Sequence, residues 1–294
     1  MSEIKDQIAK KQGESGAGGS VASGETHEEI HHENTIFAET LFQVKGFEVT
    51  NSFLSSIVVT FVLVAFFLAA GWRIRKVPRG VQNFFEIILE GALGFVDSIT
   101  GNRKTSEKLL PITLALFLFI LLNNWFGILP IIGTIGVVKA HGGEEAFVPF
   151  FRGGTADLNM TLALSLFAVV TSHIIGVFSV GSWKHFNKFI NFETLMEIPK
   201  KISKDKNVLF VNPIKFVVGF MEIISEFAKV ASLSFRLFGN IFAGEVLLAS
   251  MAMIFAFAIP LPFMFLEVLV GLVQAAVFAI LTLVFMSMAM EAEH

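Results

Sequence analysis

Long uncharged stretches alternate with short charged connectors along most of the chain. Residues 52–72, 109–129 and 158–181 are such stretches. Each is long enough to cross the ~30 Å hydrocarbon core of a bilayer as a helix that rises ~1.5 Å per residue. Asp157 stands directly before the third stretch, where an acidic side chain caps the first turn of a helix. The pattern therefore predicts membrane-spanning helices over these three ranges.

Residues 81–99 have a different pattern, because polar side chains recur within an apolar segment. This spacing is typical of an amphipathic helix that lies at the membrane surface. The polar positions are Gln82, Asn83, Glu86, Glu90 and Asp97.

The last third of the chain is almost continuously apolar, and Pro260 and Pro262 divide it into helices over 213–258 and 262–290. A single helix over 213–258 would be ~69 Å long and would have to tilt far beyond the usual ~20°. A surface segment up to about Lys229, followed by an ordinary span, is the alternative. The predicted fold is an all-α membrane protein with about five membrane helices and one interfacial helix.

Composition supports this class. The chain is 54% hydrophobic and 16% charged, whereas a soluble domain has about 25% charged residues. Without cysteine, a disulfide framework, a Cys-ligated zinc and a thiol nucleophile are excluded. A net charge of −3 gives no basic excess, so we expect no nucleic-acid partner.

Residues 1–48 form a polar segment with nine acidic and four basic side chains, rich in Gly and Ser near its start. Such a segment buries too little apolar surface to fold, so we expect a disordered tail before a membrane domain over 49–294. A histidine and glutamate cluster in it has metal-ligand chemistry, although a solvated cluster is the preferred interpretation and no metal or cofactor is expected. This cluster is His27, Glu28, Glu29, His31 and His32.

Lysine and arginine are concentrated in the connectors 73–79 and 184–206, whereas the connector 131–157 carries only Lys139 and Arg152. Basic connectors face the cytoplasm. The N-terminus and the connector 131–157 are therefore predicted to lie outside, and the C-terminus inside.

Arg236 lies within a strongly apolar stretch, where an arginine costs roughly 2.5–3.5 kcal/mol on insertion scales. A functional role is favoured, and the alternative is pairing with a carboxylate that only holds helices together. Helical spacing places Glu222, Lys229 and Arg236 on one stripe with Asn240, and sets Glu245 on another face and at another depth. In the next helix Glu267 and Gln274 are seven residues apart and share a face. Polar groups at two different depths are the arrangement that a pair of offset aqueous paths through the membrane would need.

Two weaker signals are set aside. Residues 239–244 have the glycine spacing of a phosphate loop, but they lack its lysine and a preceding strand, so no nucleotide site is expected. His173 is interpreted as a hydrogen-bonded packing residue rather than a functional one.

Residues 233–245, LSFRLFGNIFAGE, resemble the signature of subunit a of the F-type ATP synthases, and residues 124–130, 157–164 and 274–278 extend the resemblance. It implies that Arg236 is the essential arginine facing a carboxylate of the c-ring, and that the last two helices form a long, strongly tilted hairpin against that ring. Asn240, Glu245 and Gln274 match polar groups of the ion path, and Glu222 matches an acidic residue toward the cytoplasm.

Two positions depart from the family pattern. Glu267 stands where well-studied bacterial members carry a histidine that pairs with the acid at the Glu245 position, and Gly127 stands where some relatives have aspartate. Two neighbouring carboxyl groups can share a transferable proton.

The resemblance implies a stator subunit of the bacterial inner membrane, not catalytic alone, with the c-ring, the subunit b stalk and membrane lipid as partners. A self-contained channel or carrier and a purely structural anchor are the alternatives. Carriers often contain inverted repeats, and the sequence has none that we detect. The sequence of this chain does not indicate whether the transported ion is a proton or a sodium ion.

Overall fold

The computed structural model describes residues 38–71, 80–129, 132–141, 144–183, 208–254 and 259–290. The histidine cluster, the basic connectors and both chain ends lie outside these ranges, so the expectations placed on them stay predictions.

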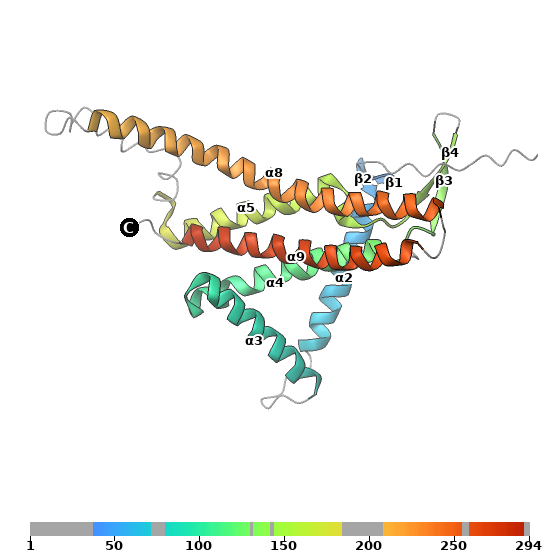
Figure 1. Ribbon diagram of the computed structural model, residues 1–294, viewed down its shortest axis with the longest axis horizontal. Coiled ribbons are helices and arrows are strands. Elements are labelled where there is room, and N and C mark those ends of the chain that lie inside the picture. Colours follow the sequence, from blue (N-terminus) through green and yellow to red (C-terminus); the bar gives the residue numbers. More distant parts are fainter. Residues whose placement is uncertain are drawn as a thin grey trace, which may run out of the picture.

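Six α-helices, one short 3-10 helix and two β-hairpins are formed in the described part of the chain (Figure 1). Four helices lie alongside one another, with α4 next to α9 and α5 next to both α8 and α9. Helix α2 crosses this layer steeply and packs against α4, while α3 packs against α4 and α9. The elements are β1 (Thr40–Val44), β2 (Phe47–Thr50), α2 (Asn51–Gly71), α3 (Val81–Thr100), α4 (Arg103–Ile128), β3 (Gly136–His141), β4 (Glu144–Pro149), η1 (Gly154–Ala156), α5 (Leu158–Val180), α8 (Val208–Ile254) and α9 (Pro260–Met290).

Five of these helices, all except α3, are long and apolar enough to cross a membrane, which confirms the predicted class. Helix α2 has 21 residues, close to one bilayer thickness. Helix α8 has 47 residues and is therefore ~70 Å long. It is one continuous helix, so the alternative of a separate surface segment before Lys229 is wrong.

The centre of the four-helix layer is apolar and tightly packed. Leu237 and Ile241 of α8 meet Ile120 of α4 and Phe278 of α9 there. Ala168 of α5 and Ala275 of α9 are completely buried, and such small side chains let membrane helices approach closely. This packing fixes the position of α8 relative to α9.

Helix α4 begins six residues before the predicted start at 109, and it contains Pro111. Asn102 caps the helix because its side chain accepts a hydrogen bond from the Lys104 N–H at 3.0 Å. Gly101 makes the sharp turn from α3 with a φ of 65°. The first turns of α4 carry charged residues, so the uncharged stretch did not reveal this start. One of these residues, Arg103, pairs with Asp97 of α3 at 2.7 Å.

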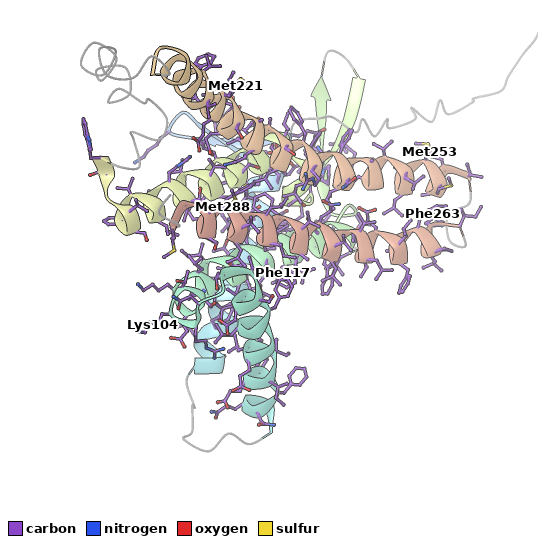
Figure 2. The ribbon with its side chains drawn as sticks, turned by 60° about the vertical axis from the view of Figure 1, so that its left-hand side comes forward. Lys104, Phe117, Met221, Met253, Phe263 and Met288 are labelled. Carbon is purple, nitrogen blue, oxygen red and sulfur yellow. The ribbon has the colours of Figure 1, made fainter. Side chains whose placement is uncertain are left out.

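Both hairpins were missed by the sequence analysis, and β1–β2 falls largely inside the segment expected to be disordered. Lys45 and Gly46 make its turn with positive φ angles of 51° and 86°. Its strands have only five and four residues, too short for a clear alternating pattern. Both hairpins lie on the same side of the molecule as the end of α8 and the start of α9 (Figure 1). Met253 and Phe263 mark that end of the helices (Figure 2).

Candidate functional site

Arg236 lies on an exposed face of α8, whereas the residues on the other side of the helix are buried against α5, α4 and α9. Its guanidinium donates to the hydroxyl of Ser232, one turn earlier, at 3.2 Å. Among the described residues, no carboxylate lies within ion-pairing distance of Arg236. The alternative in which Arg236 only joins helices of this chain through an ion pair therefore finds no support.

The surroundings of Arg236 are apolar and open. Phe235, the residue before Arg236, is 60% exposed. Asn240, one turn after Arg236, is exposed as well, so the predicted pairing of these two side chains on one face is present. This face lacks a covering element in the described part of the chain.

Glu245 lies near the other end of α8, about 13.5 Å along the helix axis from Arg236. Its carboxylate accepts two hydrogen bonds from Arg152, at 3.2 Å from Nε and 3.0 Å from one terminal nitrogen. The two side chains are 11% and 23% exposed, so the pair is largely buried. Arg152 was seen in the sequence only as a basic residue of an outer connector, and its position shortly before the Asp157 cap was the available signal.

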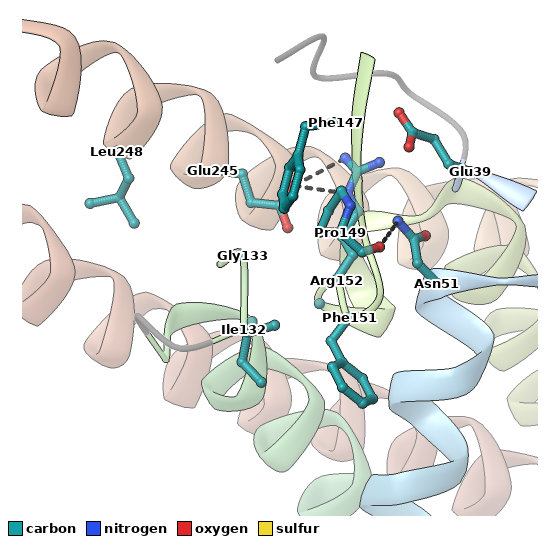
Figure 3. Close-up of a pocket in the computed structure, with 12 residues that line it drawn as sticks. Glu39, Asn51, Ile132, Gly133, Phe147, Pro149, Phe151, Arg152, Glu245 and Leu248 are labelled. Atoms are coloured by element: carbon teal, nitrogen blue, oxygen red, sulfur yellow. Dashed lines mark hydrogen bonds and ion pairs between the residues drawn. The ribbon is translucent and has the colours of Figure 1, made fainter. Parts of the chain in front are cut away.

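A cavity of about 230 Å³ adjoins this ion pair (Figure 3). The loop after β4 supplies Arg152, and α8 supplies Glu245. Asn51 at the start of α2 donates to the carbonyl of Pro149 at 3.4 Å and so ties this loop to α2. The remaining lining comes from Glu39, Gly127, Ile132, Gly133, Phe147, Phe151, Gly153 and Leu248.

Glu267 of α9 meets α8 next to Glu245, and it is not one of the residues that line the cavity. Its carboxyl group packs against Gly244, the residue before Glu245, so a Cβ at that position would collide with it. Glu267 is 8% exposed, and its Oε1 atom has no hydrogen-bond partner in the part of the chain that the structure describes. The structure thus brings together the two carboxyl groups of Glu245 and Glu267, which the sequence had left undecided.

Gln274 and Glu222 are not part of this cluster. Gln274 is half-buried on α9, two turns or about 10.5 Å beyond Glu267. Glu222 is half-buried on α8, about 21 Å before Arg236. The predicted polar groups are therefore distributed along the two helices on both sides of Arg236.

A second charged cluster lies on the Glu222 side of Arg236, and the sequence analysis did not assemble it. Glu226 accepts a hydrogen bond from Lys229 at 2.6 Å and lies 3.3 Å from the Nε2 atom of His173. The ammonium group of Lys229 stands 4.9 Å from the centre of the Phe285 ring. His173 therefore joins α5 to α8, in agreement with the preferred packing interpretation.

A buried polar network holds the short helix η1 between α2, α4 and α5. Ser52 donates to Asp157 at 2.7 Å, and Thr155 donates to Asn124 at 2.6 Å. Asn124 in turn donates to the carbonyl of Gly271 in α9 at 2.9 Å. These bonds place the loop that carries Arg152 against α8 and α9.

The glycine-spaced segment 239–244 lies inside α8 and so cannot form a phosphate-binding loop. Among the described residues there is no cluster of three or more metal-ligating side chains.

Comparison with known proteins agrees with this architecture. The family model described as ATP synthase A chain matches residues 53–287. The ATP synthase subunit a of Mycobacterium ulcerans is 35% identical over 221 residues, which cover 74% of this chain and 77% of the relative. That of Syntrophobacter fumaroxidans is 32% identical over 224 residues, covering 75% and 76%. That of Desulfotalea psychrophila is 35% identical over 227 residues, covering 74% and 75%. Because the family model and these relatives match most of its length, the chain belongs to the ATP synthase A chain family.

Proposed function

We propose that this multi-pass membrane chain is the stator subunit of the membrane sector of a rotary F-type ATP synthase. In this role it provides two offset ion paths and the arginine that couples proton flow to rotation of the c-ring. The observation that carries the proposal is Arg236, a charged side chain on an exposed face of α8 with no carboxylate beside it among the residues that the structure describes. An arginine retained at such a cost requires a partner from another molecule.

The outer path is assigned to Glu245, Glu267 and Asn240. Its support is the cavity beside Glu245 and the buried carboxyl group of Glu267 next to it. The inner path is assigned to Glu222, on the opposite side of Arg236 along α8. Gln274 of α9 is assigned to the polar lining near Arg236.

Protons reach a ring carboxylate from the outer path and neutralise it, so that the site can rotate through lipid. At Arg236 the positive charge favours the carboxylate form and release into the inner path. The same charge opposes direct passage of a cation between the paths. Each proton moved across the membrane supplies about 2.3 kcal/mol per 100 mV, which the ring delivers to distant catalytic subunits.

The hairpin of α8 and α9 fits the side of a ring because α8, at ~70 Å, is too long to stand upright in a ~30 Å core. It therefore lies strongly tilted and presents the face of Arg236 to several ring helices in turn. The chain is not catalytic alone, and the stalk subunit b holds it against rotation. The hairpin β3–β4 faces outward, as does the N-terminus, while the C-terminus is cytoplasmic in a bacterial inner membrane.

The test is ATP-driven proton pumping by membrane vesicles that contain the complete complex with Arg236→Ala. We expect pumping to fall by at least about 100-fold, since the ring carboxylate loses its counter-charge. Arg103→Ala is the matched control, because Arg103 lies at the α3–α4 turn, and it should pump normally. Undiminished pumping by the Arg236→Ala complex would refute the proposal, as would ion conduction by the purified chain without any ring.

A further inference from the structure

An apolar groove of about 730 Å³ lies between α2 and α4, and two residues of α5 complete its lining. Two exposed lysine side chains, Lys104 and Lys108, stand at the start of α4. We propose that the groove binds one anionic phospholipid, with an acyl chain between α2 and α4 and the headgroup phosphate at these two lysines. None of the lining residues comes from α8 or α9, so the inference goes beyond the proposed function and does not depend on it.

The groove is a wedge that is closed at one end. There the hydroxyl of Ser56 in α2 donates to the side-chain oxygen of Asn123 in α4 at 3.0 Å, and beyond this contact α2 diverges from the layer that contains α4 (Figure 1). The lining extends over residues 60–68 of α2 and 111–119 of α4. Each range is ~12 Å long, close to the ~15 Å of one leaflet in a ~30 Å core. The groove therefore matches an acyl chain of a single leaflet in length.

The lining selects a hydrocarbon occupant. Its one hydroxyl group, that of Thr60, already donates to the carbonyl of Ser56 at 2.7 Å. Water is disfavoured because it finds no free polar partner there, and an empty groove would lose van der Waals contacts along both walls. A helix of another protein, ~10 Å across, would occupy about 900 Å³ over the same length, which is more than the groove holds. An acyl chain fills the space without these costs.

The two lysines continue the α4 wall of the groove. At 100° per residue, Lys104 and Lys108 point within ~20° of the direction of Ala115, which lies in the middle of that wall. Lys108 comes ~4.5 Å before Pro111, where the wall begins, and Lys104 one turn earlier. Figure 2 marks Lys104 at the start of α4. The ammonium groups are therefore placed at the end of the groove away from the closed contact, where a headgroup would emerge.

The positive charge of the two lysines is not neutralised within the part of the chain that the structure describes. No carboxylate there lies within ion-pairing distance of either side chain. The nearby carboxylate of Glu107 is engaged by Arg103 at 3.3 Å. Lysine reaches lipid phosphates through its flexible stem, and clusters of basic side chains beside membrane helices bind anionic headgroups. The charge thus favours an anionic lipid over a zwitterionic one.

Photolabelling tests this inference in the complete complex, reconstituted into phosphatidylcholine vesicles. The probe is phosphatidylglycerol with a photoactivatable group in its acyl chain, and the labelled peptides are mapped by mass spectrometry. We expect label on residues 60–68 and 111–119, about 5-fold stronger than with the corresponding phosphatidylcholine probe. The double variant Lys104→Gln with Lys108→Gln should lower the phosphatidylglycerol label about 5-fold, to the phosphatidylcholine level.

Filling the groove is the second arm of the test. Ala115→Trp places an indole ring in the α4 wall and should remove most of the label from both helices. Val62→Trp is its matched control, because Val62 is 52% exposed on α2 and does not line the groove. Lys45→Gln in the turn of the β1–β2 hairpin is the control for the lost charge. Both controls should keep the parent label within about 2-fold.

Two results would overturn the inference. Equal labelling by the two probes, unchanged in the double lysine variant, would mean that the groove holds only bulk lipid. A cross-link from Ala115→Cys to stalk subunit b would mean that a protein helix covers the groove. Neither result affects the proposed function, which pumping by the Arg236→Ala complex tests separately.

Discussion

The two arginines beside α8 occupy opposite environments. Arg152 is largely buried and bonded twice to Glu245, with both charges supplied by this chain. Arg236 is exposed, and the side chain that it reaches in the described part of the chain is the hydroxyl of Ser232. The cost of placing Arg152 in the interior is offset inside the chain, whereas in the proposed function Arg236 depends on a carboxylate of another molecule. We therefore expect the loss of Arg152 mainly to lower the stability of the chain and the loss of Arg236 mainly to reduce ion transport.

The largest expected effect comes from replacing each arginine by lysine. Arg236→Lys should reduce ATP-driven pumping at least about 10-fold, because lysine lacks the planar, weakly hydrated guanidinium that pairs with a carboxylate. Arg152→Lys should keep pumping within about 3-fold, since an ammonium group can still neutralise Glu245. Equal losses in both variants would remove the distinction between the two sites.

Arg152→Ala should instead destabilise the chain. It leaves the Glu245 carboxylate without a cation in a largely buried site, which typically costs about 3 kcal/mol. Denaturation of the detergent-purified complex would measure this loss, and Arg236→Ala serves as the comparison because it removes no ion pair between described residues. A complex as stable with Arg152→Ala as without it would show that the ion pair adds nothing to stability.

Gly127→Ala tests the contact that places the Arg152 loop. The added methyl group would come within 2.9 Å of the backbone of Gly153, and overpacking of this kind costs about 1–3 kcal/mol. Pumping should fall a few-fold because Arg152 shifts away from Glu245. Gly133→Ala is the matched control, since a Cβ there meets nothing within 4 Å and the residue lines the same cavity. Identical behaviour of both variants would argue against a role for the close contact.

The smallest effect is expected at the α3–α4 turn. The Ser106 hydroxyl and the Arg103 guanidinium lower the pKa of Asp97 below its ordinary value. The folded chain therefore gains stability from Asp97 above the unfolded pKa and loses it as the pH falls through the lower folded value. Asp97→Asn should lower the denaturation midpoint by about 1 °C at neutral pH, with no difference in strong acid. A difference that persists at low pH would mean that charge is not the cause.

Much of the fold was predictable because membrane helices leave a simple signal. The uncharged stretches gave the membrane helices, and Asp157 caps α5 as expected, accepting a hydrogen bond from the Asn159 N–H at 3.0 Å. The start of α4 was missed because hydropathy does not mark a helix that continues into charged residues. The two hairpins were missed because their short strands lack a lipid-facing stripe.

The candidate site was only partly predictable, for a different reason. The burial cost of a charge pointed to Arg236, Glu245 and Glu267 one residue at a time. Their partners come from distant segments, and sequence spacing carries no information on such contacts. Arg152 is 93 positions from Glu245, and His173 meets Glu226 across two helices.

Cross-linking from the exposed face of α8 tests the central claim most directly, because the chain has no cysteine of its own. Asn240→Cys lies one turn from Arg236 on that face, and Leu237→Cys is the matched buried control. In the complete complex, with a cysteine introduced beside the ring carboxylate, we expect a disulfide to form with Asn240→Cys and not with Leu237→Cys. Absence of any cross-link from Asn240→Cys, or an equal yield from Leu237→Cys, would contradict the claim that Arg236 faces the ring.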